Sequence, residues 1–277
     1  MKWWGLAGAI SVLFAATLVE AAEQSEAAQP SRWQVDYGES RCTLSRVFGD
    51  NAPISLGIRI SPGNEAADLI VVNPAWSRGD RLPERVEVVL QPSGARLPAA
   101  FARSSPVPSA RHQFLRLSGV DRRFFDLFAT ATGLSLEGSG RELVSVPLSQ
   151  TRGALTALRT CHDDLMRAWG VDPAVVASLQ RWPMPLGDTD RMMSSDEDMT
   201  EGDSTAFFAI IRYTIGTNGR VGACDLVWSG GDQSIGDVLC QRARRGARYE
   251  PAIGADGQPV AVQFIQTMTI VRRRTFQ

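Results

Sequence analysis

The sequence lacks an excess of charge of either sign, because 29 lysine and arginine side chains are matched by 30 aspartate and glutamate side chains, and the formal net charge is -1. A protein whose main partner is a nucleic acid carries a strong basic excess, so we expect no nucleic-acid partner. Lys2 is the only lysine, and the two histidines are His112 and His162. With so few histidines and no Cys-x-x-Cys pair, the sequence supplies no closed set of zinc ligands, and it predicts neither a metal nor a cofactor.

Long apolar runs are also missing, except for one at the N-terminus. Residues 3–19 are apolar, Lys2 provides a small positive start, and Val19-Glu20-Ala21 places small residues at the two positions that a signal peptidase reads. This layout predicts a secretory signal peptide over residues 1–21 and a periplasmic location for the mature chain. The alternative is an uncleaved anchor in the inner membrane, because the run reaches the lower limit of about 17 residues for spanning a bilayer.

The four cysteines are Cys42, Cys161, Cys224 and Cys240, an even number in a chain that we expect in an oxidising compartment. Four cysteines allow three pairings. If the two halves of the chain fold independently, the natural pairs are Cys42–Cys161 and Cys224–Cys240. The spacing favours structural crosslinks over redox or metal chemistry.

Residues 33–182 begin with short strand-like runs that Gly, Pro and Asn interrupt. In the run 54–60, Ile and Leu alternate with Ser, Gly and Arg, as expected for a half-buried strand. Similar runs lie at residues 69–72, 85–90 and 142–146.

Helical patterns follow these strands. Residues 121–130 predict a short helix, and residues 150–169 predict an amphipathic helix with Cys161 on its apolar stripe, where it can reach a strand that carries Cys42. Asp172-Pro173 starts another helix, with Asp as the N-cap. We therefore predict an α+β protein whose N-terminal domain is β-rich and closed by a helix.

Residues 183–204 combine prolines and glycines with a series of acidic residues, and Arg191 is the single basic residue among them. Such a segment has too little apolar surface to offset its ordering entropy. It predicts an acidic linker, and a solvated spacer is favoured over a binding site for a basic partner.

The last part of the chain, residues 205–277, has the clearest pattern. It predicts two strands joined by a glycine turn, a helix, a short extended piece and a long strand, at residues 207–215, 220–228, 235–246, 248–252 and 260–271. The apolar stripe of the helix consists of Ile235, Val238, Leu239 and Ala243.

Several motifs in this part have a familiar arrangement. They are the glycine turn, the small-residue loop Ser229-Gly230-Gly231 before the helix, the step Tyr249-Glu250-Pro251-Ala252, and the turn Asp256-Gly257-Gln258-Pro259-Val260. With them, residues 205–277 resemble the periplasmic C-terminal domain of TonB, a ββαβ(β) fold. The cysteines on the second strand and the helix fit the variant of that domain with a disulfide. The sequence departs from TonB in its short acidic linker and in the missing Tyr-Pro pair before Phe207.

The resemblance implies a non-catalytic interaction module of the bacterial cell envelope that binds a partner segment by strand addition. The candidate partner-binding residues are Gln263, Ile265 and Thr267 in the last strand, with Arg244 and Arg245 at the end of the helix. The partner would be another envelope protein, such as an outer-membrane receptor or its periplasmic segment. The arginines have two alternative interpretations, since they could fold back onto the acidic linker or simply be solvated.

Two other functions are alternatives. With a retained anchor, the chain would be a TonB-type energy transducer for outer-membrane transport, and it would then contact the membrane. An enzyme would have to use the N-terminal domain, but residues 133–138 have the wrong spacing for a nucleophile elbow. His162 is adjacent to Asp163 and Asp164 in one helix, where neighbouring side chains do not face each other. We therefore expect no enzymatic activity.

Overall fold

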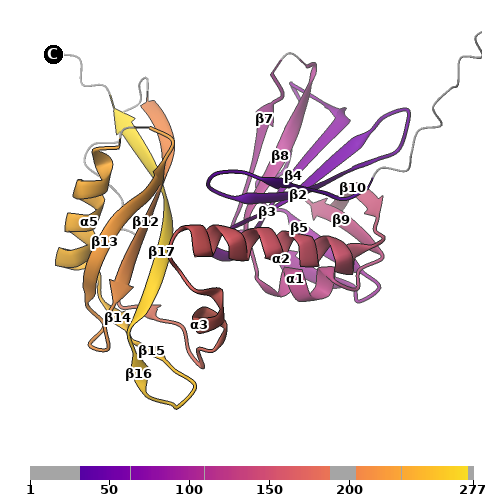
Figure 1. The fold of residues 1–277 in the computed structure, drawn as a ribbon. Coiled ribbons are helices and arrows are strands. Elements are labelled where there is room, and N and C mark those ends of the chain that lie inside the picture. The colour runs from indigo at the N-terminus through magenta and orange to yellow at the C-terminus, as the bar shows by residue number, and fades with distance from the viewer. Residues whose placement is uncertain (1–31, 63, 109, 188–203, 232, 274–277) are drawn as a thin grey trace, which may run out of the picture. The chain divides into compact units, whose positions relative to one another are not determined.

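Six antiparallel strands form the first sheet of the N-terminal part. The computed structural model describes residues 32–62, 64–108, 110–187, 204–231 and 233–273, so the expected signal peptide lies outside the described residues. The strand order is β1-β2-β3-β4-β8-β7 (Figure 1). The bounds are β1 Gln34–Tyr37, β2 Cys42–Phe48, β3 Ile54–Ser61, β4 Asn64–Ser77, β7 Phe101–Pro106 and β8 His112–Val120. The predicted alternation is confirmed in β3, where Leu56 and Ile58 are buried and Arg59 lies on the other face.

A second, four-stranded sheet and two helices complete this part. The second sheet has the order β10-β9-β5-β6. Its strands are β5 Glu87–Gln91, β6 Ala95–Pro98, β9 Gly133–Gly138 and β10 Arg141–Pro147, and the helices are α1 Arg123–Phe128 and α2 Thr151–Ala168. One hydrophobic cluster joins both sheets to the helices, and its fully buried members include Leu44, Ile58, Leu69, Leu117, Val88, Leu136, Phe124 and Leu158. Val89 is buried too.

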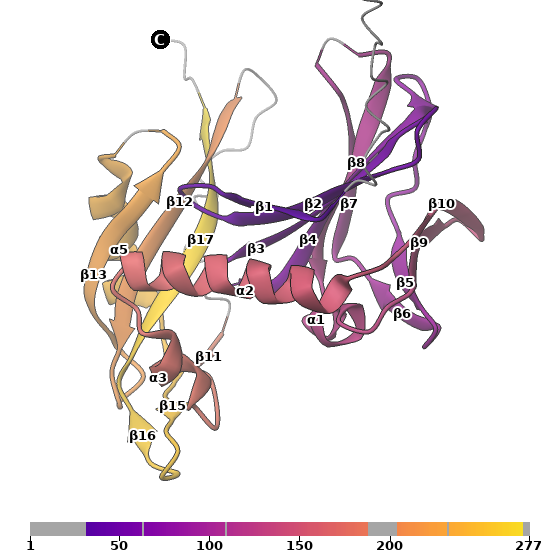
Figure 2. The same cartoon turned by 45° about the vertical axis from the view of Figure 1, so that its right-hand side comes forward.

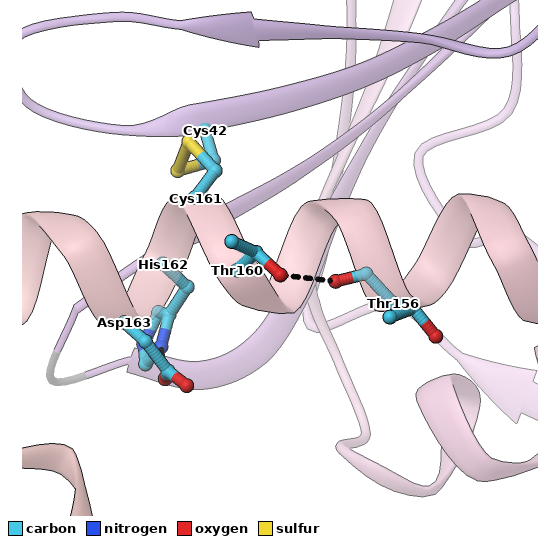
Figure 3. The surroundings of a disulfide bond; sticks show 6 residues. All are labelled: Cys42, Thr156, Thr160, Cys161, His162 and Asp163. Carbon is cyan, nitrogen blue, oxygen red and sulfur yellow. Dashed lines mark hydrogen bonds and ion pairs between the residues drawn. A yellow bond between two sulfur atoms is a disulfide. The ribbon is translucent and has the colours of Figure 1, made fainter.

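The disulfide Cys42–Cys161 fixes helix α2 to the first sheet. Helix α2 runs along β1, β2 and β3 (Figure 2). Its apolar stripe faces the strands, so that Cys161 points at Cys42 in β2, and the two Cα atoms are 6.0 Å apart (Figure 3). Both cysteines are fully buried. The predicted closing helix and the predicted cysteine pair are thus both present.

The C-terminal part is built on a three-stranded antiparallel sheet with the order β13-β12-β17. The main elements are β12 Ser204–Ile215, β13 Val221–Ser229, α5 Ile235–Gly246 and β17 Val262–Arg273, with the short strands β14 Tyr249–Glu250, β15 Ala252–Ile253 and β16 Pro259–Val260. Helix α5 packs on β13 and β12. The order of elements agrees with the predicted one. The apolar stripe of α5 needs one correction, because Val238 is 43% exposed: it lies at the margin of the face that buries Leu239 and Ala243.

The start of the segment predicted as a linker is attached to the C-terminal part. Strand β11, Met184–Pro185, lies inside the predicted segment 183–204 and pairs with β14. Just before it, the backbone of Arg181 bonds to Ile253 in both directions. These hydrogen bonds attach the start of the segment to the C-terminal part, an attachment that its composition does not reveal. Residues 188–203 lie outside the described residues.

The end of helix α2 packs against the C-terminal sheet, apart from the cores of the N-terminal part and of the C-terminal part. Gly170 terminates α2 with φ +73°, as expected, and Asp172 caps α3 (Pro173–Ala177) by accepting a 2.8 Å hydrogen bond from the backbone N–H of Ala174. Met166, Trp169 and Val171 form a third cluster with residues of the C-terminal sheet.

All described ladders are antiparallel, and helices and sheets follow each other in blocks. This mixed organisation agrees with the predicted α+β class. The two disulfides indicate an oxidising, exported environment. Among the helices in the described ranges, none has the length and apolarity to cross a membrane.

Candidate functional site at the edge strand β17

Strand β17 forms one edge of the C-terminal sheet. It pairs with β12 over its whole length, from Ser204↔Arg273 to Ile215↔Val262, and this ladder contains no register shift. No described strand pairs with its other side. Strand β4 approaches β17 but forms no ladder with it. Along this free side, every second residue of β17 directs its backbone N–H and C=O away from β12.

The opposite edge strand, β13, is less regular. Its ladder with β12 has register shifts between Ile210 and Ile211 and between Tyr213 and Ile215. It is also crosslinked to helix α5 through Cys224–Cys240, with Cα atoms 5.4 Å apart. A bulged strand is a poor template for an added strand, because its backbone groups no longer lie in one row. The geometry therefore favours β17.

One face of β17 belongs to the core beneath α5. Phe264 contacts the rings of Tyr213 and Tyr249, with centroids 5.5 Å and 5.9 Å away. The hydroxyl of Tyr213 donates a 2.7 Å hydrogen bond to Oε1 of Gln266 and shares a 2.5 Å hydrogen bond with the hydroxyl of Tyr249. This polar network inside an apolar core fixes the strand against its neighbours.

The other face of β17 carries Gln263, Ile265 and Thr267, the residues around which we expected the partner-binding edge. Ile265 is 3% exposed and packs with Ile210 against the end of helix α2, including Trp169. The guanidinium of Arg212 strengthens this contact, since Nη1 donates a 2.7 Å hydrogen bond to the carbonyl of Trp169 and Nη2 binds Asp225 at 2.8 Å. Ile265 is therefore a structural residue.

The remaining predicted residues of β17 are more accessible. Gln263 is exposed and Thr267 is partly buried. They share a face with Ile265, because alternate residues of a strand point the same way. What this strand offers to a partner is thus mainly its backbone edge, flanked by Gln263 near the start.

Arg244 and Arg245 do not join this edge. Both are exposed in the last turn of helix α5, which packs over β13 and β12, nearer to the β13 edge of the sheet than to β17 (Figure 1). Arg248 binds the carbonyls of Ala247 and Arg245 at 2.7 Å and 3.0 Å, and it thereby satisfies acceptors at the helix end. The structure assigns this group of arginines no place in the β17 site.

His162 lies next to Cys161 in helix α2, and most of its side chain is buried. Its side chain is 20% exposed, and Nδ1 lies 3.3 Å from Oδ1 of Asp163 although the two residues are adjacent in the helix. In Figure 3 the His162 side chain points to the side of α2 away from Cys42, together with that of Asp163. Burial lowers the pKa of His162, and the hydrogen bond that its ring donates to the carboxylate of Asp163 opposes this shift. Within the described ranges, no three His, Cys, Asp or Glu residues form a group that could hold a metal ion.

Sequence reasoning missed the residues that cover β17. Trp169 ends the predicted helix 150–169, and nothing in the sequence linked it to the C-terminal sheet. The available signal was the pair Ile210 and Ile265. Both are apolar and lie on the sheet face opposite to the one that α5 covers, so they are expected to be buried against another element.

Comparison with protein-family models, with curated proteins and with solved structures found no match for this chain.

Proposed function

We propose that this protein is a non-catalytic interaction module of the periplasm, which binds an extended segment of another envelope protein along the free edge of β17. The observation that carries the proposal is the long, regular and unpaired edge of this strand. Backbone groups on such an edge bind any extended peptide that can align with them, so the affinity comes from main-chain hydrogen bonds.

The proposal is supported by what β17 lacks. Natural proteins protect exposed sheet edges with prolines, bulges or short strands, because an open edge pairs with other chains. Residues 262–273 contain no proline, and the ladder contains no bulge. An edge left open over this length is a feature of a strand that acquires a partner.

Site-specific photocrosslinking of the full chain in the cell envelope tests the proposal. A photoreactive residue replaces Gln263, which is exposed on β17, or Ala223, which is exposed on the opposite edge strand β13. We expect a discrete crosslinked adduct from position 263 and none from position 223, since only the first position flanks the proposed strand.

The result can contradict the proposal in two ways. An adduct from position 223 alone would assign binding to β13, and no adduct from either position would remove the support for strand addition. After identification of the partner, hydrogen exchange on the purified complex provides a second measurement. Protection must then appear at the outward amides of β17.

A further inference from the structure

A small ladder beside the end of helix α5 combines arginines with exposed apolar side chains. Strand β11 pairs with β14 in the register Met184↔Glu250, and the backbone N–H of Leu186 continues this ladder by donating a 2.7 Å hydrogen bond to the carbonyl of Arg248. Arg220 forms an isolated antiparallel bridge with Arg248. Directly opposite residues of antiparallel strands share a face, and so do alternate residues of one strand. One face of the ladder therefore carries Met184, Leu186, Arg220, Arg248 and Glu250.

The two apolar side chains on this face are exposed. Met184 is 53% exposed and Leu186 is 48% exposed. Tyr249 points to the opposite face of the ladder, where it belongs to the hydrophobic core of the C-terminal part. An apolar side chain in water gains free energy when another apolar phase covers it, so the outer face of the ladder favours a partner that offers such a phase.

The last turn of helix α5 ends beside this face and adds two exposed arginines, Arg244 and Arg245. The connection is Arg248, whose Nη2 donates a 3.0 Å hydrogen bond to the carbonyl of Arg245. The ion pairs among the described residues involve neither Arg244, Arg245 nor Arg220. We call six residues the basic surface: Met184, Leu186, Arg220, Arg244, Arg245 and Arg248.

Positive charge exceeds negative charge on this surface, although the whole chain has a formal net charge of only -1. Glu250 is the one acidic residue on the ladder face, and its carboxylate lies 3.8 Å from Nη1 of Arg181, a cation outside the basic surface. Asp225 binds Arg212, and Asp237 lies in the first turn of α5, at the end of the helix away from the basic surface. The charges of the C-terminal part are thus unevenly distributed, and the basic surface is complementary to an anionic partner.

We propose that the basic surface binds a membrane that contains anionic phospholipids. Arginines are attracted to the negative surface of such a bilayer, and each of them strengthens the binding. Exposed apolar side chains beside the arginines can enter the boundary between the headgroups and the acyl chains. A soluble anion would use the arginines but leave Met184 and Leu186 in water, so the combination favours a bilayer. The proposal does not depend on strand addition, because none of these residues lies in β17.

Cosedimentation of the full chain with lipid vesicles tests the proposal. The vesicles consist of phosphatidylcholine alone or of phosphatidylcholine with phosphatidylglycerol, in buffer of low ionic strength. The neutral vesicles measure any binding through the apolar run of residues 3–19, which all variants share. We expect the wild-type protein to bind the anionic vesicles more strongly than the neutral ones, and added salt to reduce this difference. Equal binding to both kinds of vesicle overturns the proposal.

The variant Arg244→Gln/Arg245→Gln tests the contribution of the charges. Its matched control is Arg141→Gln/Arg152→Gln, which removes two exposed arginines from β10 and α2. One basic side chain near an anionic bilayer contributes about fivefold in affinity, so the first variant should bind the anionic vesicles roughly 25-fold more weakly than wild type. The control should bind like wild type, and an equal loss in both variants overturns the proposal. Arg245→Gln alone should lose about fivefold, and it replaces the pair if the double variant does not fold.

The variant Met184→Gln/Leu186→Gln distinguishes a membrane from a soluble anionic partner. Its control is Phe101→Gln, which removes a side chain that is 75% exposed in β7. We expect the first variant to bind the anionic vesicles about tenfold more weakly than wild type, and the control to bind like wild type. A loss in the arginine variant without a loss in this apolar variant would assign the arginines to a soluble anion or an acidic polypeptide, and it would overturn the membrane as the partner.

Discussion

Removing the disulfide Cys42–Cys161 should destabilise the protein more than removing Cys224–Cys240. The first bond joins residues 119 positions apart, and the second joins residues 16 positions apart. A crosslink restricts the unfolded chain, and the restriction grows with the logarithm of the loop length. The loop-closure entropy gives roughly 5 kcal/mol for the first disulfide and about 3 kcal/mol for the second.

The perturbation is the double substitution Cys42→Ala/Cys161→Ala, compared with Cys224→Ala/Cys240→Ala. Each variant loses two sulfur atoms, and Cys42, Cys161 and Cys240 are all at most 3% exposed, so the losses of packing are similar. The difference between the variants then reports mainly the loop lengths. Urea unfolding followed by far-ultraviolet circular dichroism gives the free energy of unfolding of each variant.

We expect the free energy of unfolding to be highest for the wild type, lower for the variant without Cys224–Cys240 and lowest for the variant without Cys42–Cys161. The last two should differ by about 2 kcal/mol. Equal losses, or a larger loss for the short loop, would refute the reasoning from chain entropy. Reduction of the wild-type protein provides an independent check, because it opens both loops and leaves every atom of the core in place.

Three further predictions concern single residues. Gly219 has φ +72°, and a Cβ there would overlap the carbonyl oxygen of Tyr249. We therefore expect Gly219→Ala to lower the free energy of unfolding by about 2–5 kcal/mol. The control Gly257→Ala has φ +76° but open space around the new Cβ, so it should lower the free energy of unfolding by only about 1–2 kcal/mol. Tyr213→Phe removes the hydroxyl that bonds Tyr249 and should cost about 1–3 kcal/mol in urea unfolding. The pKa of His162 is lowered in the folded state, so on acidification the unfolded state takes up the proton of this residue at a higher pH than the folded state does. The thermal midpoint should therefore fall as the pH drops below about 6.5. His162→Gln should flatten this pH dependence, and an unchanged slope would contradict the assignment.

Local sequence patterns correctly predicted those strands and helices whose burial pattern is visible within a few consecutive residues. The alternation in residues 54–60 correctly placed Leu56 and Ile58 inside, because a strand with one buried face shows its period directly. The stripe on α2 placed Cys161 against the first sheet, and Asp172-Pro173 marked the start of α3 through a capping bond between neighbours in the chain. Each of these signals lies within a few residues of the feature that it predicts.

Features that depend on contacts between distant segments could not be predicted in this way. Strand β11 exists because Met184–Pro185 meets β14, and nothing in the composition of the segment indicates that pairing. The burial of Ile265 depends on Trp169, almost a hundred positions earlier in the chain.

The position of Ile265 changes what strand addition at β17 can recognise. Helix α5 and its core occupy one face of the sheet, and the end of α2 occupies the opposite face around Ile265. Strand addition normally takes its affinity from the backbone and its selectivity from side-chain pockets beside the edge. Since both faces near the middle of β17 are filled by the protein itself, a partner strand finds a backbone template with few pockets. Selectivity must then come from the ends of the strand, near the exposed Gln263, or from a second contact elsewhere on the protein.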